Sequence, residues 1–124
     1  MRPPSPRALR VCFALALAMV LAVSLWPMPE PPPLHTGWDK TDHLASFLAL
    51  GLLGLPSWPS QRARVLVGLL FHGALIEVLQ GFTGYRQADW FDFVADAAGA
   101  GLAALIVVAW RRRDLRAGSR PDTQ

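Results

Sequence analysis

The sequence has one cysteine and few charged residues, and both shortages narrow the class of protein. Of its 124 residues, 52% are apolar and only 17% are charged, with a mean hydropathy of +0.30. The apolar content excludes an intrinsically disordered chain, and the single Cys12 excludes a scaffold held by disulfides. At this length the chain forms at most one compact domain.

Four apolar segments account for most of the chain. They cover residues 11–26, 43–55, 63–82 and 93–110, and proline- or glycine-rich connections separate them. A helix that spans a membrane needs about 20 mostly apolar residues, and about 17 suffice. The second segment is short, but the stretch from Trp38 to Trp58 is long enough for about 30 Å of helix. We therefore predict an all-α, polytopic membrane helix bundle with four transmembrane helices.

Arginine and lysine are concentrated in alternate hydrophilic segments, which predicts an orientation in the membrane. Ten of the 12 lie before the first apolar segment, at the junction of the second and third (Arg62 and Arg64), or after the fourth, and only Lys40 and Arg86 lie elsewhere. Because cytoplasmic loops carry the excess of basic residues, we predict that both termini are cytoplasmic. The expected organisation is a basic N-terminus over residues 1–10, a membrane domain over 11–110 and a loose basic tail over 111–124.

These features predict a multi-pass protein of the cytoplasmic (inner) membrane, with membrane lipids as partners and no nucleic acid. The first segment has a second interpretation. Basic residues precede it, and small residues at Ala22 and Ser24 fit the cleavage site of a signal peptide. Cleavage would leave three helices without changing the orientation of the rest.

Polar residues within or beside the apolar segments fall into three groups. In the predicted topology all three lie at the extracytoplasmic leaflet. Charged residues are costly in a membrane helix unless they have a partner or a function. The groups are Asp39, Lys40, Asp42 and His43 at the start of the second segment, Glu77 and Gln80 near the end of the third, and Arg86, Asp89, Asp92 and Asp96 at the start of the fourth.

Small residues continue the acidic face of the fourth segment. Ala95, Gly99 and Ala103 form a small-xxx-small ridge, which we interpret as a surface for close helix packing. His72, near the middle of the third segment, does not share a helical face with Glu77. We expect it to be a neutral histidine that hydrogen bonds to a neighbouring helix.

At these residues the chain resembles the VanZ-like family of small bacterial membrane proteins, over about residues 38–105. The motifs are Lys40-x-x-His43-x-x-x-Phe47, Glu77-x-x-Gln80-x-Phe82 and Arg86-x-x-Asp89-x-x-Asp92-x-x-x-Asp96-x-x-Gly99. The family often has Asn where this chain has Asp96. The resemblance implies a polytopic protein of the bacterial cell envelope, and the member that gives the family its name is linked to low-level resistance to the glycopeptide teicoplanin. The resemblance implies no reaction.

We consider two functions for the polar cluster besides simple helix capping. It is first a candidate binding site for a lipid headgroup, an amphiphilic drug or a divalent cation such as Mg²⁺ or Ca²⁺. A lipid-linked envelope precursor and a second copy of the chain are candidate partners. The candidate binding residues are Lys40, His43, Glu77, Gln80, Arg86, Asp89, Asp92 and Asp96.

The second function is a membrane-embedded hydrolase or transferase that acts on a lipid-linked substrate. His43 would be its base or nucleophile, Glu77 or Asp92 the partner of that histidine, and Arg86 would bind the phosphate. The sequence contains neither a Gly-x-Ser-x-Gly elbow nor a His-Glu-x-x-His motif. It therefore leaves open whether the protein is an enzyme.

Overall fold

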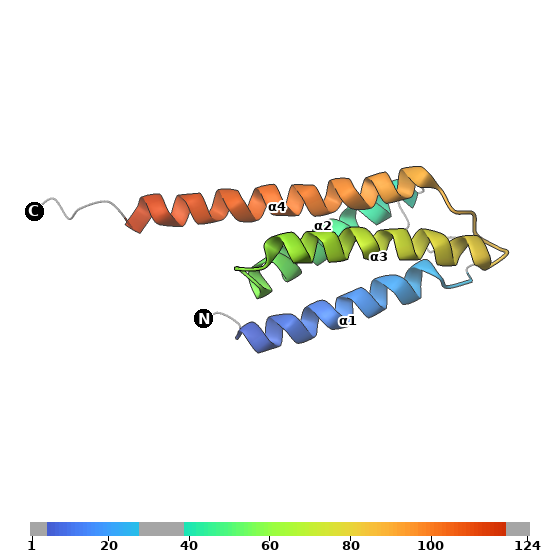
Figure 1. Cartoon of the computed structure of the whole chain (residues 1–124), viewed down its shortest axis with the longest axis horizontal. Helices are drawn as coiled ribbons and strands as arrows, with labels where there is room; N and C mark the ends of the chain where they lie inside the picture. The colour runs from blue at the N-terminus through green and yellow to red at the C-terminus, as the bar shows by residue number, and fades with distance from the viewer. Residues whose placement is uncertain (1–4, 28–38, 119–124) are drawn as a thin grey trace, which may run out of the picture.

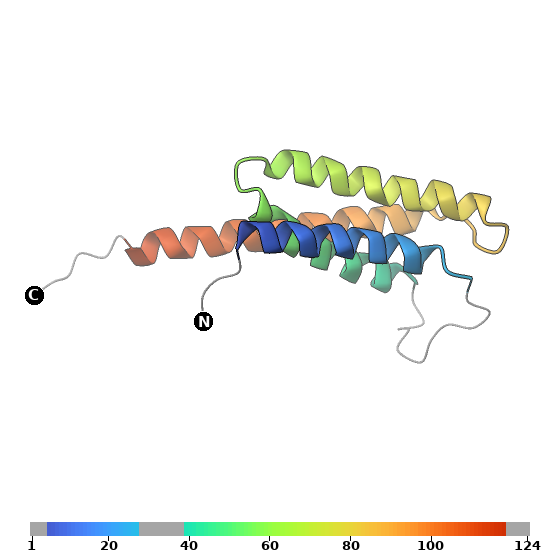
Figure 2. The ribbon, with the colours of Figure 1, turned by 90° about the horizontal axis from the view of Figure 1, so that it is seen from below.

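Four antiparallel helices make up the computed structural model, which describes residues 5–27 and 39–118. They are α1 (Pro6–Ser24), α2 (Asp39–Ser57), α3 (Arg62–Phe82) and α4 (Trp90–Gly118). All regular structure in the described ranges is helical, so the predicted all-α class is confirmed. The helices run side by side along one long axis, and α4 extends past the others (Figures 1 and 2).

Three of the four helices are long and apolar enough to cross a membrane. These are α1, α3 and the Trp90–Arg116 part of α4. Large apolar side chains lie exposed on the outer surface of the bundle: Phe71 is 71% exposed and Leu105 is 69% exposed. Such a surface suits a lipid environment, in which apolar side chains need no burial in protein. The structure thus agrees with a multi-pass membrane protein.

Capping and residue preferences explain where α1 begins and why α4 is long. The Ser5 side chain accepts a hydrogen bond from the Ala8 backbone N–H, and Pro6 occupies the first helical position, where the lack of an N–H costs nothing. At the other end of the described chain α4 continues to Gly118, so the expectation of a loose tail from residue 111 is wrong as far as residue 118, and the rest of that tail lies outside the described residues. Arginine favours helix, and a basic residue in the last turn complements the helix dipole.

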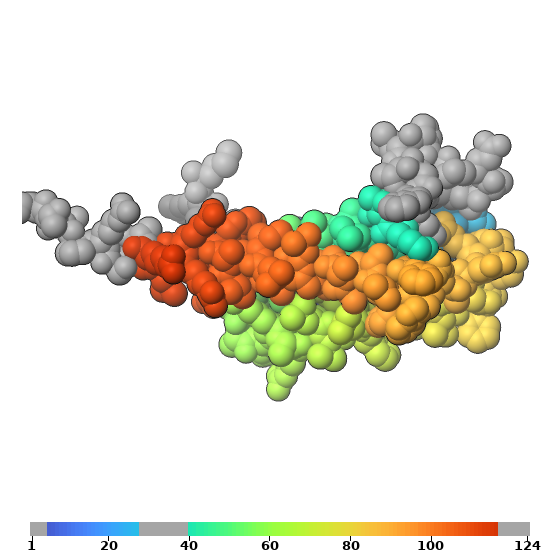
Figure 3. Space-filling view, turned by 90° about the horizontal axis from the view of Figure 1, so that it is seen from above, coloured from blue at the N-terminus to red at the C-terminus, as the bar shows by residue number. Residues whose placement is uncertain are grey.

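The closest helix contact is between α2 and α4, and small residues make it possible. Gly99 lies against the backbone of Leu44 and Leu48, and Gly51 lies against Ala103. The predicted small-residue ridge on α4 is therefore a packing surface. Figure 3 shows α4 along one face of the molecule, with α2 on one side of it and α3 on the other.

Two ends of the bundle are distinguished below. At the polar end, α1 and α3 finish and α2 and α4 begin; at the arginine end, α1 and α3 begin and α2 and α4 finish (Figure 1). Between them lies an apolar core built around Phe47, Leu50, Leu69 and Ile76, each at most 1% exposed. The core packs α2, α3 and α4 together, and these three helices supply the side chains of the polar end.

Candidate functional site

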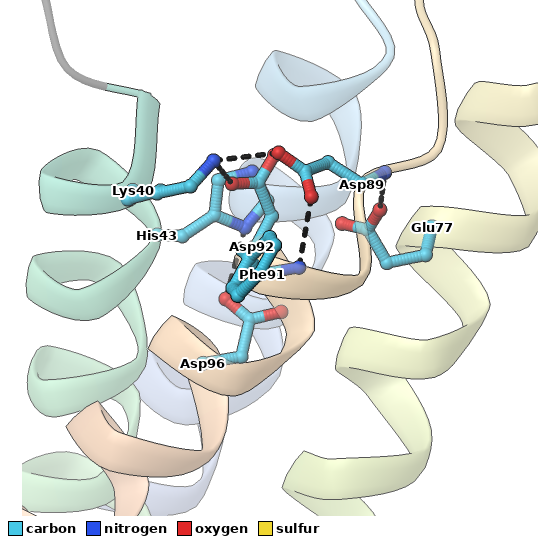
Figure 4. A network of polar contacts seen from close by, with 7 residues as sticks. All are labelled: Lys40, His43, Glu77, Asp89, Phe91, Asp92 and Asp96. Atoms are coloured by element: carbon cyan, nitrogen blue, oxygen red, sulfur yellow. Dashed lines mark hydrogen bonds and ion pairs between the residues drawn. The ribbon is translucent and has the colours of Figure 1, made fainter.

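The polar end brings together side chains from the start of α2, the end of α3 and the start of α4 (Figure 4). Asp89 is the last residue of the α3–α4 connection, directly before the first residue of α4, Trp90. Its Oδ1 accepts a hydrogen bond from the Phe91 backbone N–H at 2.9 Å, and its backbone carbonyl accepts one from Asp92 N–H at 2.9 Å. This capping places the next two turns of α4, with Asp92 and Asp96, against α2 and α3.

Lys40 joins α2 to the start of α4. Its Nζ donates to Asp89 Oδ2 at 2.6 Å and to Asp92 Oδ1 at 3.1 Å, and it lies 5.8 Å from the centre of the Phe91 ring. The hydrogen bond from Lys40 is the main reason why the pKa of Asp89, which lies in the connection outside the helices, is below its usual value. The carboxylates of Asp89 and Asp92 thus have a cationic partner in Lys40.

A second, deeper pair lies directly below this ion pair in Figure 4. His43 Nδ1 and Asp96 Oδ1 are 2.9 Å apart and share a hydrogen bond. Both side chains are buried, with His43 7% and Asp96 0% exposed. This contact fixes the histidine ring between α2 and α4.

Glu77 approaches the same place from α3. Its Oε2 accepts a hydrogen bond from the Asp89 backbone N–H at 2.8 Å, whereas its Oε1 is buried and has no hydrogen-bond partner in the described part of the chain. Asp96 Oδ2 is buried without a partner in the same way. A ligand atom from each of His43, Glu77 and Asp96 lies within 4.8 Å of the others, and all three residues are buried. We call these three residues the buried triad.

Space for the Asp96 carboxylate depends on Gly73 of α3. A Cβ at position 73 would lie 2.7 Å from Asp96 Oδ2 and 3.2 Å from Asp96 Cβ. No side chain larger than that of glycine therefore fits there unless Asp96 moves. The glycines of this end allow the helices to close around a charged group.

Six of the eight residues that the sequence singled out meet here, and the other two, Gln80 and Arg86, make different contacts. Lys40, His43, Glu77, Asp89, Asp92 and Asp96 form the cluster of Figure 4. Gln80 is buried, but its Nε2 donates to the Ser24 backbone carbonyl at 3.0 Å, so it ties the ends of α3 and α1 together. Arg86 is half-buried in the α3–α4 connection, where its backbone N–H donates to Thr83 Oγ1.

Sequence reasoning missed two features of the site. The role of Gly73 was missed, because its neighbour Asp96 is on another helix. The contact between Lys40 and Asp92 was also missed, because spacing along one helix does not show which residue of another helix lies opposite. The Nε2 of His72 is buried without a hydrogen-bond partner among the described residues, so the expected bond from His72 to a neighbouring helix stays a prediction.

Comparisons with known proteins give little further information. The chain is 33% identical over 90 residues to an uncharacterized protein of Schizosaccharomyces pombe (strain 972 / ATCC 24843). The aligned part covers 68% of this chain but only 54% of the yeast protein, so the chain matches about half the length of that relative. No family profile matches the chain, and no solved structure matches it significantly.

Proposed function

We propose that the protein is a VanZ-like membrane protein of the cell envelope that binds a divalent cation in the buried triad. One observation carries this proposal: among residues 5–27 and 39–118, two carboxylate oxygens, Glu77 Oε1 and Asp96 Oδ2, are buried without a hydrogen-bond partner beside His43. Buried polar atoms are nearly always hydrogen bonded. A pair of unpartnered carboxylate oxygens at one place therefore indicates that a ligand completes the site.

Electrostatics favours a cation over an anionic headgroup as the direct occupant. Burying a neutral polar group without a hydrogen bond costs roughly 2–7 kcal/mol. Burying an unpaired carboxylate costs more. Among the described residues, Lys40 forms its ion pairs with Asp89 and Asp92, not with Glu77 or Asp96. A cation inside the triad would offset the carboxylate charge, whereas a phosphate there would add to it.

The ligand set narrows the class of metal. One imidazole and two carboxylates suit first-row divalent ions such as Zn²⁺, Mn²⁺ and Fe²⁺, whereas Ca²⁺ takes six to eight oxygen ligands and Mg²⁺ keeps most of its waters. Ligand atoms held about 2.1 Å from one ion lie no more than about 4.2 Å apart. The triad, at 4.8 Å or less, needs only a small closure to bind such an ion. Three protein ligands leave positions open for water or for a phosphate of a headgroup or drug.

Four membrane spans with both termini in the cytoplasm are the second part of the proposal. The α2 helix has 19 residues, which corresponds to about 28 Å. It packs against α1, α3 and α4 along the bundle, antiparallel to α1 and α3 and parallel to α4 (Figure 2). The arginine end carries the basic excess that marks the cytoplasmic side. The triad would then lie about 6–9 Å below the ends of its helices, near the outer headgroups.

Thermal unfolding of the full chain in detergent tests the metal site. After treatment with a chelator, addition of Zn²⁺ or Mn²⁺ should raise the unfolding midpoint, while Mg²⁺ and Ca²⁺ should do so far less. A ligand at 100 times its Kd adds about 2.7 kcal/mol to the free energy of unfolding. Equilibrium dialysis with Zn²⁺ or Mn²⁺ should give about one ion per chain.

Two Asp→Asn variants one helical turn apart separate specific coordination from general acidity. Asp96→Asn should abolish the metal-dependent shift, and Asp92→Asn should weaken it only a few-fold, because Lys40 compensates the charge of Asp92. If Asp96→Asn fails to fold, Glu77→Gln replaces it. A wild-type protein that no ion stabilises would refute the proposal, and so would equal losses in the two Asp variants.

The enzyme hypothesis remains the alternative, and the His43–Asp96 pair is the observation that favours it. A carboxylate that orients a histidine is the usual arrangement of a general base. A bound ion with open positions could also activate water. The test is hydrolysis of a lipid-linked phosphate substrate. If hydrolysis requires the metal and is lost in His43→Ala while the fold is retained, the protein is a hydrolase and not a binding protein.

A further inference from the structure

A second hollow, unrelated to the triad, lies at the arginine end. It has a volume of about 360 Å³ and is formed where the last turns of α4 pass the beginning of α3 (Figure 3). Its lining consists of Arg62, Val108, Arg111, Arg112, Asp114 and Leu115. The hollow exists because α4 continues beyond residue 110, a feature that the sequence did not predict.

The charge of this hollow is strongly positive. Three arginines and one aspartate line it, which gives a formal charge of +2. The Nε of Arg62 is buried and has no hydrogen-bond partner among the described residues. Guanidinium groups bind phosphate oxygens in pairs of parallel hydrogen bonds. Three guanidinium groups around one hollow, one of them with a buried N–H that has no partner among the described residues, therefore fit an oxyanion.

The apolar part of the lining indicates what is attached to the anion. Val108 and Leu115 provide a hydrocarbon wall next to the arginines. Trp110 lies at the same level of α4 and is 54% exposed, as is typical of the membrane–water interface. A soluble anion would gain nothing from this wall, whereas the first carbons of an acyl chain would cover it.

We propose that this hollow is a binding site for one anionic phospholipid. Arg62, Arg111 and Arg112 hold the headgroup phosphate, and the glycerol and upper acyl carbons lie on Val108, which is nearer the membrane than the arginines. Basic pockets between membrane helices bind anionic headgroups in general. The proposal does not depend on the metal site, which lies at the opposite end of the bundle.

Matched arginine variants distinguish this site from a general attraction to negative lipid. Arg62→Gln and Arg112→Gln remove residues that line the hollow. Arg113→Gln removes the same charge from the adjacent residue, which is exposed and does not line it. Native mass spectrometry of the full chain, with dioleoyl phosphatidylglycerol added at increasing concentration, measures the occupancy of each bound lipid. Dioleoyl phosphatidylcholine serves as the neutral comparison.

We expect one phosphatidylglycerol to bind at least about ten-fold more tightly than phosphatidylcholine, since each charge-assisted contact contributes strongly. Arg62→Gln and Arg112→Gln should each weaken it about ten-fold, and Arg113→Gln about two-fold at most. Inorganic phosphate at millimolar concentration should not displace the lipid. Equal losses in all three variants, no preference for the anionic lipid, or displacement by inorganic phosphate would each overturn the proposal.

Discussion

Gly99→Ala tests how closely the packing of α2 and α4 determines the site. A Cβ at position 99 would overlap the carbonyl oxygen of Leu44 and lie 2.9 Å from the backbone N of Leu48. Both atoms belong to the main chain, so no change of rotamer relieves the overlap. The two helices must move apart.

The expected magnitude follows from these contacts. Ordinary van der Waals separation is about 3.5 Å, so α2 must retreat from α4 by at least about 0.5 Å. Overpacking of this kind costs about 3 kcal/mol when the backbone is the obstacle. Replacing glycine by alanine inside a helix returns about 1 kcal/mol. The net loss in the free energy of unfolding is therefore about 2 kcal/mol.

Gly101→Ala is the matched control, because a Cβ there meets nothing within 4 Å. It should leave stability unchanged or raise it by up to about 1 kcal/mol. Unfolding in mixed micelles, followed by circular dichroism, measures both variants. Because Leu44 is adjacent to His43, Gly99→Ala should also weaken metal binding. If Gly99→Ala is as stable as Gly101→Ala, the close contact between the two helices does not exist as described.

Three other predictions concern the site and its orientation. Gly73→Ala should lower metal affinity about ten-fold, because its Cβ would lie 2.7 Å from Asp96 Oδ2 and displace that oxygen. The ion pair of Asp89 with Lys40 should stabilise the fold above the usual aspartate pKa of about 3.9 and lose its effect as the pH falls through the lowered pKa of Asp89. Asp89→Asn should remove this acid-dependent part of the unfolding free energy. Gln87→Cys should react with a membrane-impermeant maleimide from outside the cell.

Each of these predictions has its own control. Gly68→Ala, on the same helix with nothing within 4 Å of its Cβ, should leave metal affinity unchanged. For the acid dependence, wild-type and Asp89→Asn curves of equal slope below neutral pH would show that the ion pair contributes nothing. For the topology, Ser60→Cys in a Cys12→Ala background should react only after the membrane is opened. The reverse labelling pattern would invert the proposed orientation.

How much of the site could be predicted depends on which physical constraint acts at each residue. Hydropathy and the alternation of basic connections suffice to predict four helices and to place their polar residues at one end. They do not determine how far each helix is rotated about its axis. Which carboxylate of α4 faces Lys40 and which faces His43 depends on that rotation, which the glycine contacts between α2 and α4 help to set. Sequence spacing within α4 contains no information about them.

The helical tail shows a different limit. The expectation of a loose segment from residue 111 rested on its high charge. Four of the residues from Arg111 to Arg116 are arginines, which favour helix where a formed helix precedes them. The hydrophobic pattern could not reveal this, because these turns are exposed and bury no apolar face.

The two proposed sites should be energetically independent, although α4 carries residues of both. Asp96 and Arg112 lie about 24 Å apart along the axis of α4. The apolar core around Phe47 and Leu69 separates them, and substitutions this far apart without shared partners act additively. Asp96→Asn should therefore leave phosphatidylglycerol occupancy unchanged, and Arg112→Gln should leave the metal-dependent shift in unfolding unchanged. If either substitution impairs the distant site, α4 moves as a unit between two positions, and the binding of the cation and of the lipid is coupled through it.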